Sequence, residues 1–146
     1  MLPTMILVLS LLLAAPDAGT PARRPYVDEV MARVRNGTVD TEHERDRVKP
    51  EDVPHYAREY LASKKWAEKS FIIELVQDSH DPVLADVMWD ALDVPDCDDD
   101  GCWWVRATAL AYLDGDFKKF SGYFENHKVC RAALQKRLKE RAKRKK

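Results

Sequence analysis

Three cysteines and one histidine have the chemistry to bind a metal ion or to form a disulfide bond. Cys97 and Cys102 flank a four-residue segment. Farther along the chain, His127 lies three residues before Cys130, a spacing that places both side chains on one face of a helix. Three sulfur atoms and one imidazole nitrogen are a ligand set of tetrahedral zinc, so these residues are a candidate zinc site.

The same thiols can instead form a disulfide bond, which an oxidising compartment favours. Of the three pairings we predict the local one, between Cys97 and Cys102, with Cys130 left free. In the chain-entropy model, closing this short loop stabilises the fold by about 2 kcal/mol. The alternative is a bridge from Cys130 to either of the other two cysteines.

The acidic segment around these cysteines offers oxygen ligands for a calcium ion. Asp96, Asp98 and Asp100 recur at alternate positions and precede a glycine, as at the start of a calcium-binding loop. The twelfth position of such a loop is Ala107, where a bidentate Glu is needed, so we expect no EF-hand and at most a partly hydrated calcium site. The alternative is a solvated acidic turn that caps the helix after it.

Ser79, His80 and Asp81 carry the functional groups of a hydrolytic relay, but they are adjacent in the sequence. Adjacent side chains cannot line up as nucleophile, base and orienting acid, and neither G-x-S-x-G nor H-E-x-x-H occurs in the chain. We therefore predict a protein without catalytic activity, and an unrecognised hydrolase is an alternative. No cofactor is expected unless calcium or zinc binds at the sites above.

Opposite charges are concentrated in two parts of the chain. Residues 20–127 hold 14 basic and 23 acidic side chains, a net charge of −9, whereas residues 128–146 hold ten basic side chains and one acid, a net charge of +9. We predict that the last basic residues contact a protein partner or an anionic surface of the cell envelope: Lys136, Arg137, Lys139, Arg141, Lys143, Arg144, Lys145 and Lys146. The alternative is that they fold back along the acidic part of the chain. Nucleic acid is not an expected partner, because no recognition motif accompanies the basic residues.

The first residues are typical of a signal peptide. The apolar run of residues 5–15 would reach about 16 Å as a helix, against about 30 Å of hydrocarbon in a bilayer. Small residues follow around Ala18, so we predict that residues 1–19 are cleaved and that the protein is periplasmic or secreted, and not transmembrane after cleavage. Because no Lys or Arg precedes the run, an uncleaved interfacial anchor is the alternative.

The first half of the remaining chain shows helical spacing of apolar residues. We expect a first helix from residue 26 that Asn36 and Gly37 end. Residues 38–49 are polar and predict a loop or a solvated helical turn. Pro50 and its acidic neighbours then begin a long helical stretch, which the residues Ser63, Lys64 and Lys65 interrupt.

Three further helices complete the expected fold. Asp81 and Pro82 begin one, and residues 103–113, which are apolar nearly all round, form the most buried one. Residues 117–138 form the last, as one helix. No segment alternates apolar and polar residues like a strand, so the fold class is all-α: a small helical bundle or a short stack of helical hairpins.

Two segments resemble each other and a known repeat family. Residues 81–92 and 102–113 superpose with an offset of 21, with Leu84 on Val105 and Leu92 on Leu113. The Asp-Pro start, the Val-Arg pair and the closing Ala-Leu and Tyr-Leu pairs are similar to the second helices of HEAT-type repeats. The resemblance covers residues 67–113. It implies a binding scaffold without a reaction of its own, and it assigns no functional residues.

These patterns predict four parts of the chain. Residues 1–19 form the signal peptide, residues 20–25 a flexible N-terminus, residues 26–135 a helical domain and residues 136–146 a basic C-terminal helix or tail. We expect an exported, non-enzymatic binding or structural protein, with a metal-binding module as the alternative.

Overall fold

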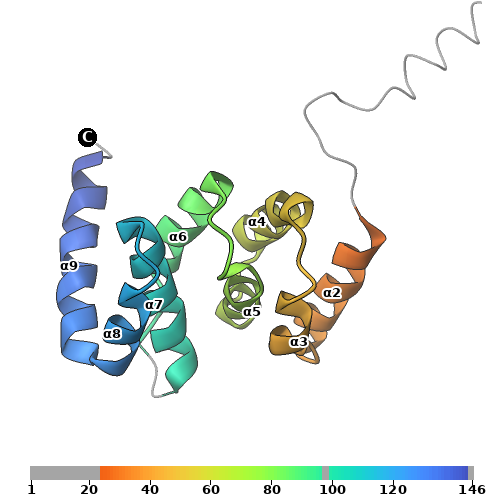
Figure 1. The fold of residues 1–146 in the computed structure, drawn as a ribbon, viewed down its shortest axis with the longest axis horizontal. Helices are drawn as coiled ribbons and strands as arrows, with labels where there is room; N and C mark the ends of the chain where they lie inside the picture. The colour runs from red at the N-terminus through yellow and green to blue at the C-terminus, as the bar shows by residue number, and fades with distance from the viewer. Residues whose placement is uncertain (1–23, 97–98, 145–146) are drawn as a thin grey trace, which may run out of the picture.

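The part of the chain that the structure describes is built from helices alone. The computed structural model describes residues 24–96 and 99–144, and neither range contains a strand (Figure 1). The prediction of an all-α fold is therefore confirmed. Among these residues no helix is long and apolar enough to span a bilayer. The predicted signal peptide, residues 1–19, lies outside the described residues.

The first described helix, α2, spans Pro25–Asn36 and ends where the sequence predicted. A proline occupies its first turn, where the missing N–H has no role. Four apolar side chains at helical spacing are buried on one face: Val27, Val30, Met31 and Val34. Gly37 ends the helix at φ +71°, a conformation that glycine adopts without steric cost.

The polar segment after α2 contains a short helix, α3, Thr41–Arg45, and is only partly solvated. Glu44 is 6% exposed, and it accepts hydrogen bonds from the Tyr26 hydroxyl and, at 2.9 Å, from Arg33 Nη2. Both donors come from α2. The expectation of a solvated turn therefore missed a buried carboxylate, because its partners are distant in the sequence.

The long stretch from Pro50 divides where the sequence predicted. A 3-10 helix, η1, Pro50–Asp52, leads into α4, Val53–Ala62, and α5 spans Trp66–Val76. Ser63 adopts an extended conformation, at φ −76° and ψ 143°, which ends α4.

The next two helices also follow their sequence signals. The Asp81 carboxylate accepts a hydrogen bond from the Val83 N–H at 3.0 Å and so caps a 3-10 helix, η2, Pro82–Leu84. This turn continues into α6, Ala85–Ala91. Helix α7, Asp100–Asp114, buries eight of its 15 residues and is the most buried described helix, as predicted.

The end of the chain forms two helices where we expected one. Helix α8 spans Lys119–Glu125 and α9 spans His127–Arg144. Asn126 separates them at φ −127° and ψ 95°, and its side-chain oxygen accepts a hydrogen bond from the Val129 N–H at 3.2 Å. The prediction of one helix was therefore wrong. Apolar residues keep helical spacing through this position, so their pattern does not show that the asparagine side chain caps a new helix there.

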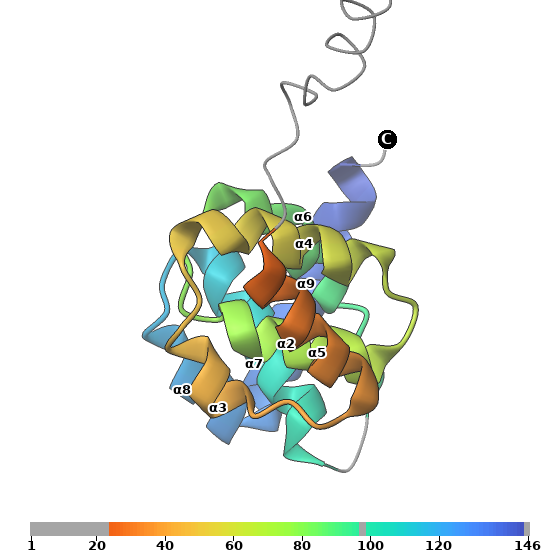
Figure 2. The ribbon, with the colours of Figure 1, turned by 90° about the vertical axis from the view of Figure 1, so that its right-hand side faces the viewer.

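The helices lie in one row from α2 to α9, and Figure 2 looks along this row from the α2 end. Along the row α3 packs on α5, α5 on α7, and α7 on α9. Helix α4 pairs with α5 and α6 pairs with α7, so that their apolar faces meet in one core. The two segments whose similarity suggested a repeat are the consecutive helices α6 and α7.

Candidate anion-binding face of the C-terminal helix

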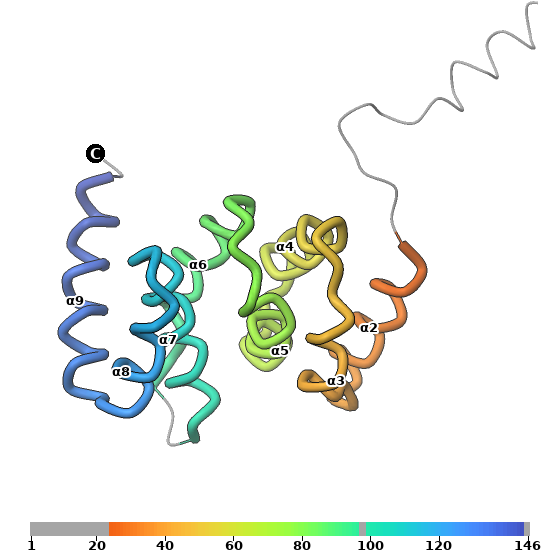
Figure 3. The backbone as a smooth tube through the Cα atoms, viewed as in Figure 1, coloured from red at the N-terminus to blue at the C-terminus, as the bar shows by residue number. Residues whose placement is uncertain are grey.

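Six of the eight residues predicted to contact an anionic partner lie on α9, at one end of the row (Figure 3). Helix α9 packs on α7 and α8 through apolar side chains. Cys130 is completely buried, Leu134 is 9% exposed, and Leu138 packs against the core. The basic residues 136–144 therefore continue a helix that is already docked on the body of the molecule.

The arginines of α9 point toward that body. Arg137 Nη2 lies 2.5 Å from Asp114 Oδ1. Arg141 Nη2 lies 2.7 Å from Asp93 Oδ1, and its Nη1 donates to the Trp89 carbonyl oxygen at 3.2 Å. These contacts are the fold-back arrangement that the sequence left open as an alternative.

Two further arginines of α9 lie over tryptophan rings. The Arg144 guanidinium is 4.9 Å from the ring centroid of Trp89, and the Arg131 guanidinium is 5.2 Å from that of Trp103. A planar guanidinium is attracted to the face of an aromatic ring and is less strongly hydrated than an ammonium group. Arginine is therefore suited to the side of α9 that faces the protein.

Asp114 accepts hydrogen bonds from two side chains at this contact. Burial tends to raise the pKa of its carboxyl, but hydrogen bonds from Tyr123 and Arg137, with the charges of Lys119 and Arg137, hold that pKa below its usual range. Burial and the bond to Asp114 raise the pKa of Tyr123 to about 12, so its hydroxyl remains a donor. The pair of Asp114 and Arg137 is consequently charged at neutral pH.

The lysines of α9 occupy the other side of the helix. Four of them are exposed and fall within an arc of about 80°, at 100° per residue: Lys128, Lys136, Lys139 and Lys143. This arc lies opposite the buried side chains of Cys130 and Leu134. In the described part of the chain no carboxylate forms an ion pair with these four lysines. We call this set the lysine face.

The predicted anion-binding residues thus separate by type. Three contact the acidic body: Arg137, Arg141 and Arg144. Three belong to the lysine face: Lys136, Lys139 and Lys143. Lys145 and Lys146 lie outside the described residues. The prediction omitted Lys128, which the helical spacing of the lysines would have identified.

The candidate zinc ligands do not come together among the described residues, where no group of three metal-binding side chains occurs. The exposed His127 ring stacks on Trp103 with centroids 3.6 Å apart. Cys130 is free and buried, and burial raises its pKa, which disfavours the thiolate that zinc requires. Of the disulfide pairings, the one between Cys97 and Cys102 remains open. It stays a prediction, as does the zinc site, because Cys97 lies outside the described residues.

The acidic segment has structural roles where it is described. Asp96 Oδ1 lies 2.8 Å from Arg106 Nη1, and a hydrogen bond and the charge of Arg106 hold the pKa of Asp96 below its usual range. Asp99 caps α7 by accepting hydrogen bonds from two backbone N–H groups of its first turn. Asp100 is the first residue of α7. Asp98 lies outside the described residues, so the calcium site stays a prediction.

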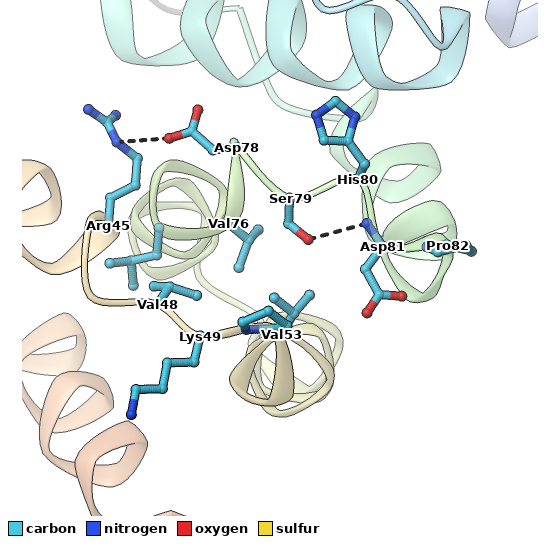
Figure 4. A pocket seen from close by; sticks show the side chains of 12 residues that line it. Arg45, Val48, Lys49, Val53, Val76, Asp78, Ser79, His80, Asp81 and Pro82 are labelled. Carbon is cyan, nitrogen blue, oxygen red and sulfur yellow. Dashed lines mark hydrogen bonds and ion pairs between the residues drawn. The ribbon is translucent and has the colours of Figure 1, made fainter.

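A cavity of about 520 Å³ between η1, α5 and η2 contains the residues of the hydrolase alternative (Figure 4). Ser79 Oγ accepts a hydrogen bond from the Asp81 backbone N–H at 3.2 Å, and the Asp81 carboxylate caps η2. The His80 ring packs edge-on against Phe117 with centroids 4.2 Å apart. Each of the three groups has its own partner, and they do not form a relay.

Comparison with known proteins assigns no family to the chain. No protein-family model, curated protein or solved structure matches it. The resemblance of residues 67–113 to HEAT-type repeats therefore stays a prediction, and the function has to be argued from the site.

Proposed function

We propose that this chain is an exported, non-enzymatic binding protein whose lysine face contacts an anionic surface of the cell envelope. The observation that carries the proposal is the separation of the cations on α9. The arginines bind the acidic body, and four lysines remain exposed together on the opposite side. Contacts to the body alone would not need this second set of cations.

The strength of such a contact follows from simple electrostatics. A lysine close to an anionic membrane surface contributes about 1 kcal/mol, so four lysines contribute about 4 kcal/mol, which corresponds to a dissociation constant of about 1 mM. The acidic body is repelled by the same surface, so the molecule should approach it with α9 foremost. We expect a weak and reversible contact.

Co-sedimentation with lipid vesicles tests this proposal. The test variant replaces Lys136, Lys139 and Lys143 by glutamine, and the wild type serves as the reference. We expect the wild type to bind vesicles with anionic headgroups and not zwitterionic ones, and the variant to lose most of that binding. Deletion of residues 136–146 is a poorer test, because it also removes the contacts of Arg137 and Arg141.

A matched control separates the position of the lysines from total charge. Lys64, Lys65 and Lys118 are exposed and lie outside α9, so replacing them by glutamine changes the net charge equally. This control should bind anionic vesicles like the wild type. If both triple variants lose binding to the same extent, net charge explains the contact and the lysine face has no special role.

Export has a separate test in the intact mass of the protein recovered from the periplasm or the medium. We expect a mass that lacks the first 18 or 19 residues. Alkylation of the denatured, unreduced protein should modify one thiol if Cys97 and Cys102 are paired, because denaturation exposes the buried Cys130. A full-length mass would contradict cleavage of the signal peptide.

A further inference from the structure

A small cavity lined by aromatic rings lies where α5, α7 and the segment leading into α8 meet. Its volume is about 210 Å³, and six residues line it: Gln77, Asp78, Trp104, Thr108, Phe117 and Phe120. A protein cavity of about 150 Å³ is already large enough to admit a benzene molecule. The aromatic pocket, as we call these six residues, is thus large enough for a small organic ligand.

The walls of the aromatic pocket are rings that the fold leaves partly uncovered. No residue of α8 is buried, although the helix carries Phe120 and Phe124. Trp104 contacts both rings edge-on, with centroid distances of 4.8 and 5.3 Å, so the rings hold one another in place. Aromatic side chains that are ordered but not covered are typical of a binding site.

The polar groups of the pocket are few. Gln77 Oε1 accepts a hydrogen bond from Trp104 Nε1 at 2.6 Å, which sets the orientation of the indole. Thr108 is 3% exposed, and its hydroxyl has no hydrogen-bond partner among the described residues. A buried hydroxyl without a partner is unfavourable, and a ligand that carries a hydroxyl group could pair with it.

The charge around the pocket favours a cation. The Asp78 carboxylate lines the pocket, and its side chain is 77% exposed. No described lysine or arginine lines the pocket. A neighbouring hollow on Trp104 is lined by two acidic residues, Glu42 and Glu74, and by one basic residue, Arg45. Arg45 Nε lies 3.6 Å from Asp78 Oδ2, and solvent screens this ion pair because the Asp78 side chain is exposed.

We propose that the aromatic pocket binds a small quaternary ammonium compound of the size of choline, through the rings of Trp104, Phe117 and Phe120 and the carboxylate of Asp78. The faces of aromatic rings attract quaternary ammonium groups, and a carboxylate at the rim adds Coulomb attraction. This site is separate from the lysine face and does not depend on its function.

Titration with choline tests the proposal, and 3,3-dimethyl-1-butanol is its neutral counterpart of the same shape. Binding is followed by the NMR shift of the Trp104 indole N–H in the full mature chain. We expect choline to shift this signal with a dissociation constant of about 1 mM, and the neutral alcohol to bind at least tenfold more weakly. Equal binding of the two compounds, or no shift with either, would overturn the proposal.

Two variants test the role of the Asp78 carboxylate. Asp78→Asn should weaken choline binding severalfold, and Arg45→Gln should strengthen it, because Asp78 then has no competing cation. Choline binding that is unchanged in Asp78→Asn would overturn the role of the carboxylate and with it the proposal. A monomeric short-chain phosphatidylcholine, titrated in parallel, distinguishes a lipid headgroup from a free ammonium compound as the source of the ligand.

Discussion

Arginine and lysine have different roles on α9 because their charged groups interact differently with water and with rings. Arg137 and Arg144 lie against a carboxylate and a tryptophan ring. The ammonium group of lysine is compact and strongly hydrated, so it is costly to bring against a protein surface without an ideal partner. Lys136 and Lys139, on the same helix, remain in water.

The contact between Arg137 and Asp114 predicts how stability depends on pH. Replacing Arg137 by glutamine should lower the free energy of unfolding by about 2 kcal/mol at neutral pH, since it removes a partly buried charged hydrogen bond. The folded-state pKa of Asp114 is depressed, so its contribution is present above its unfolded pKa, about 3.9, and is lost as the pH falls through the folded value. The difference between wild type and variant should therefore narrow below about pH 4.

Urea unfolding at neutral and acid pH measures this difference, and Lys139→Gln is the control. Lys139 is exposed and has no ion pair in the described part of the chain, so its replacement should change stability very little at either pH. A gap between wild type and Arg137→Gln that stays constant with pH would show that Asp114 is not the group involved.

Two glycines make a matched pair for a test of backbone conformation. Gly115 ends α7 at φ +68°, whereas Gly122 lies within α8. A Cβ atom at either position would meet no atom within 4 Å beyond the adjoining backbone. Gly115→Ala should destabilise the protein by about 1 kcal/mol, because an L residue is strained there. Gly122→Ala should stabilise it by about 0.5 kcal/mol through helix propensity. Thermal unfolding that shifts in the same direction for both variants would contradict this explanation.

Among the elements, the break between α8 and α9 decides which way the lysine face points. Asn126 ends one helix and caps the next, so α9 starts with a new direction and packs back on α7. A single straight helix could not place Cys130 and Leu134 against the body in this way. The position of the lysines therefore depends on one residue outside both helices.

Replacing Asn126 by alanine should destabilise the docking of α9 by about 1 kcal/mol, because the Val129 N–H loses its acceptor. Asn126→Asp keeps an acceptor oxygen and should be close to the wild type. Hydrogen exchange of the first amides of α9 measures the effect locally. If the alanine variant exchanges like the aspartate variant, the side chain of Asn126 does not hold the junction.

The molecule as a whole combines an acidic body with one basic helix. Residues 20–127 carry a net charge of −9 and residues 128–146 one of +9, so the near-neutral total hides a strong dipole. The contacts of Arg137 and Arg141 use part of this attraction within the fold. The lysine face directs the remaining positive charge outward, where an anionic surface can meet it.

Salt should weaken vesicle binding by the lysine face more than the arginine contacts within the fold. Raising the salt concentration from about 0.1 M to about 1 M shortens the screening length from about 10 Å to about 3 Å, so vesicle binding by the exposed lysines should fall at least tenfold. The helical circular dichroism signal should stay the same, because the partly buried contacts of α9 are screened less. Vesicle binding that persists at high salt would point to apolar contacts in place of the lysine face.

Local sequence signals were sufficient for most of the helices. The boundaries at Gly37, at Ser63 and at the Asp81–Pro82 pair could be predicted without the fold, because each of these residues acts on its own backbone. The junction at Asn126 could not be predicted in this way. The apolar residues before and after it keep helical spacing whether or not the asparagine side chain caps a new helix. The partners of Glu44 come from another helix, and no local pattern shows them.

By itself the sequence determined the all-α fold, the buried α7 and the concentration of positive charge at the end of the chain, since these depend on composition and periodicity. Only the tertiary structure decided which of those charges are available. The approach of Asp114 to Arg137 and of Asp93 to Arg141 joins residues far apart in the chain, and it leaves the lysines on the outer side. The aromatic pocket likewise exists only because α5, α7 and the segment leading into α8 pack together.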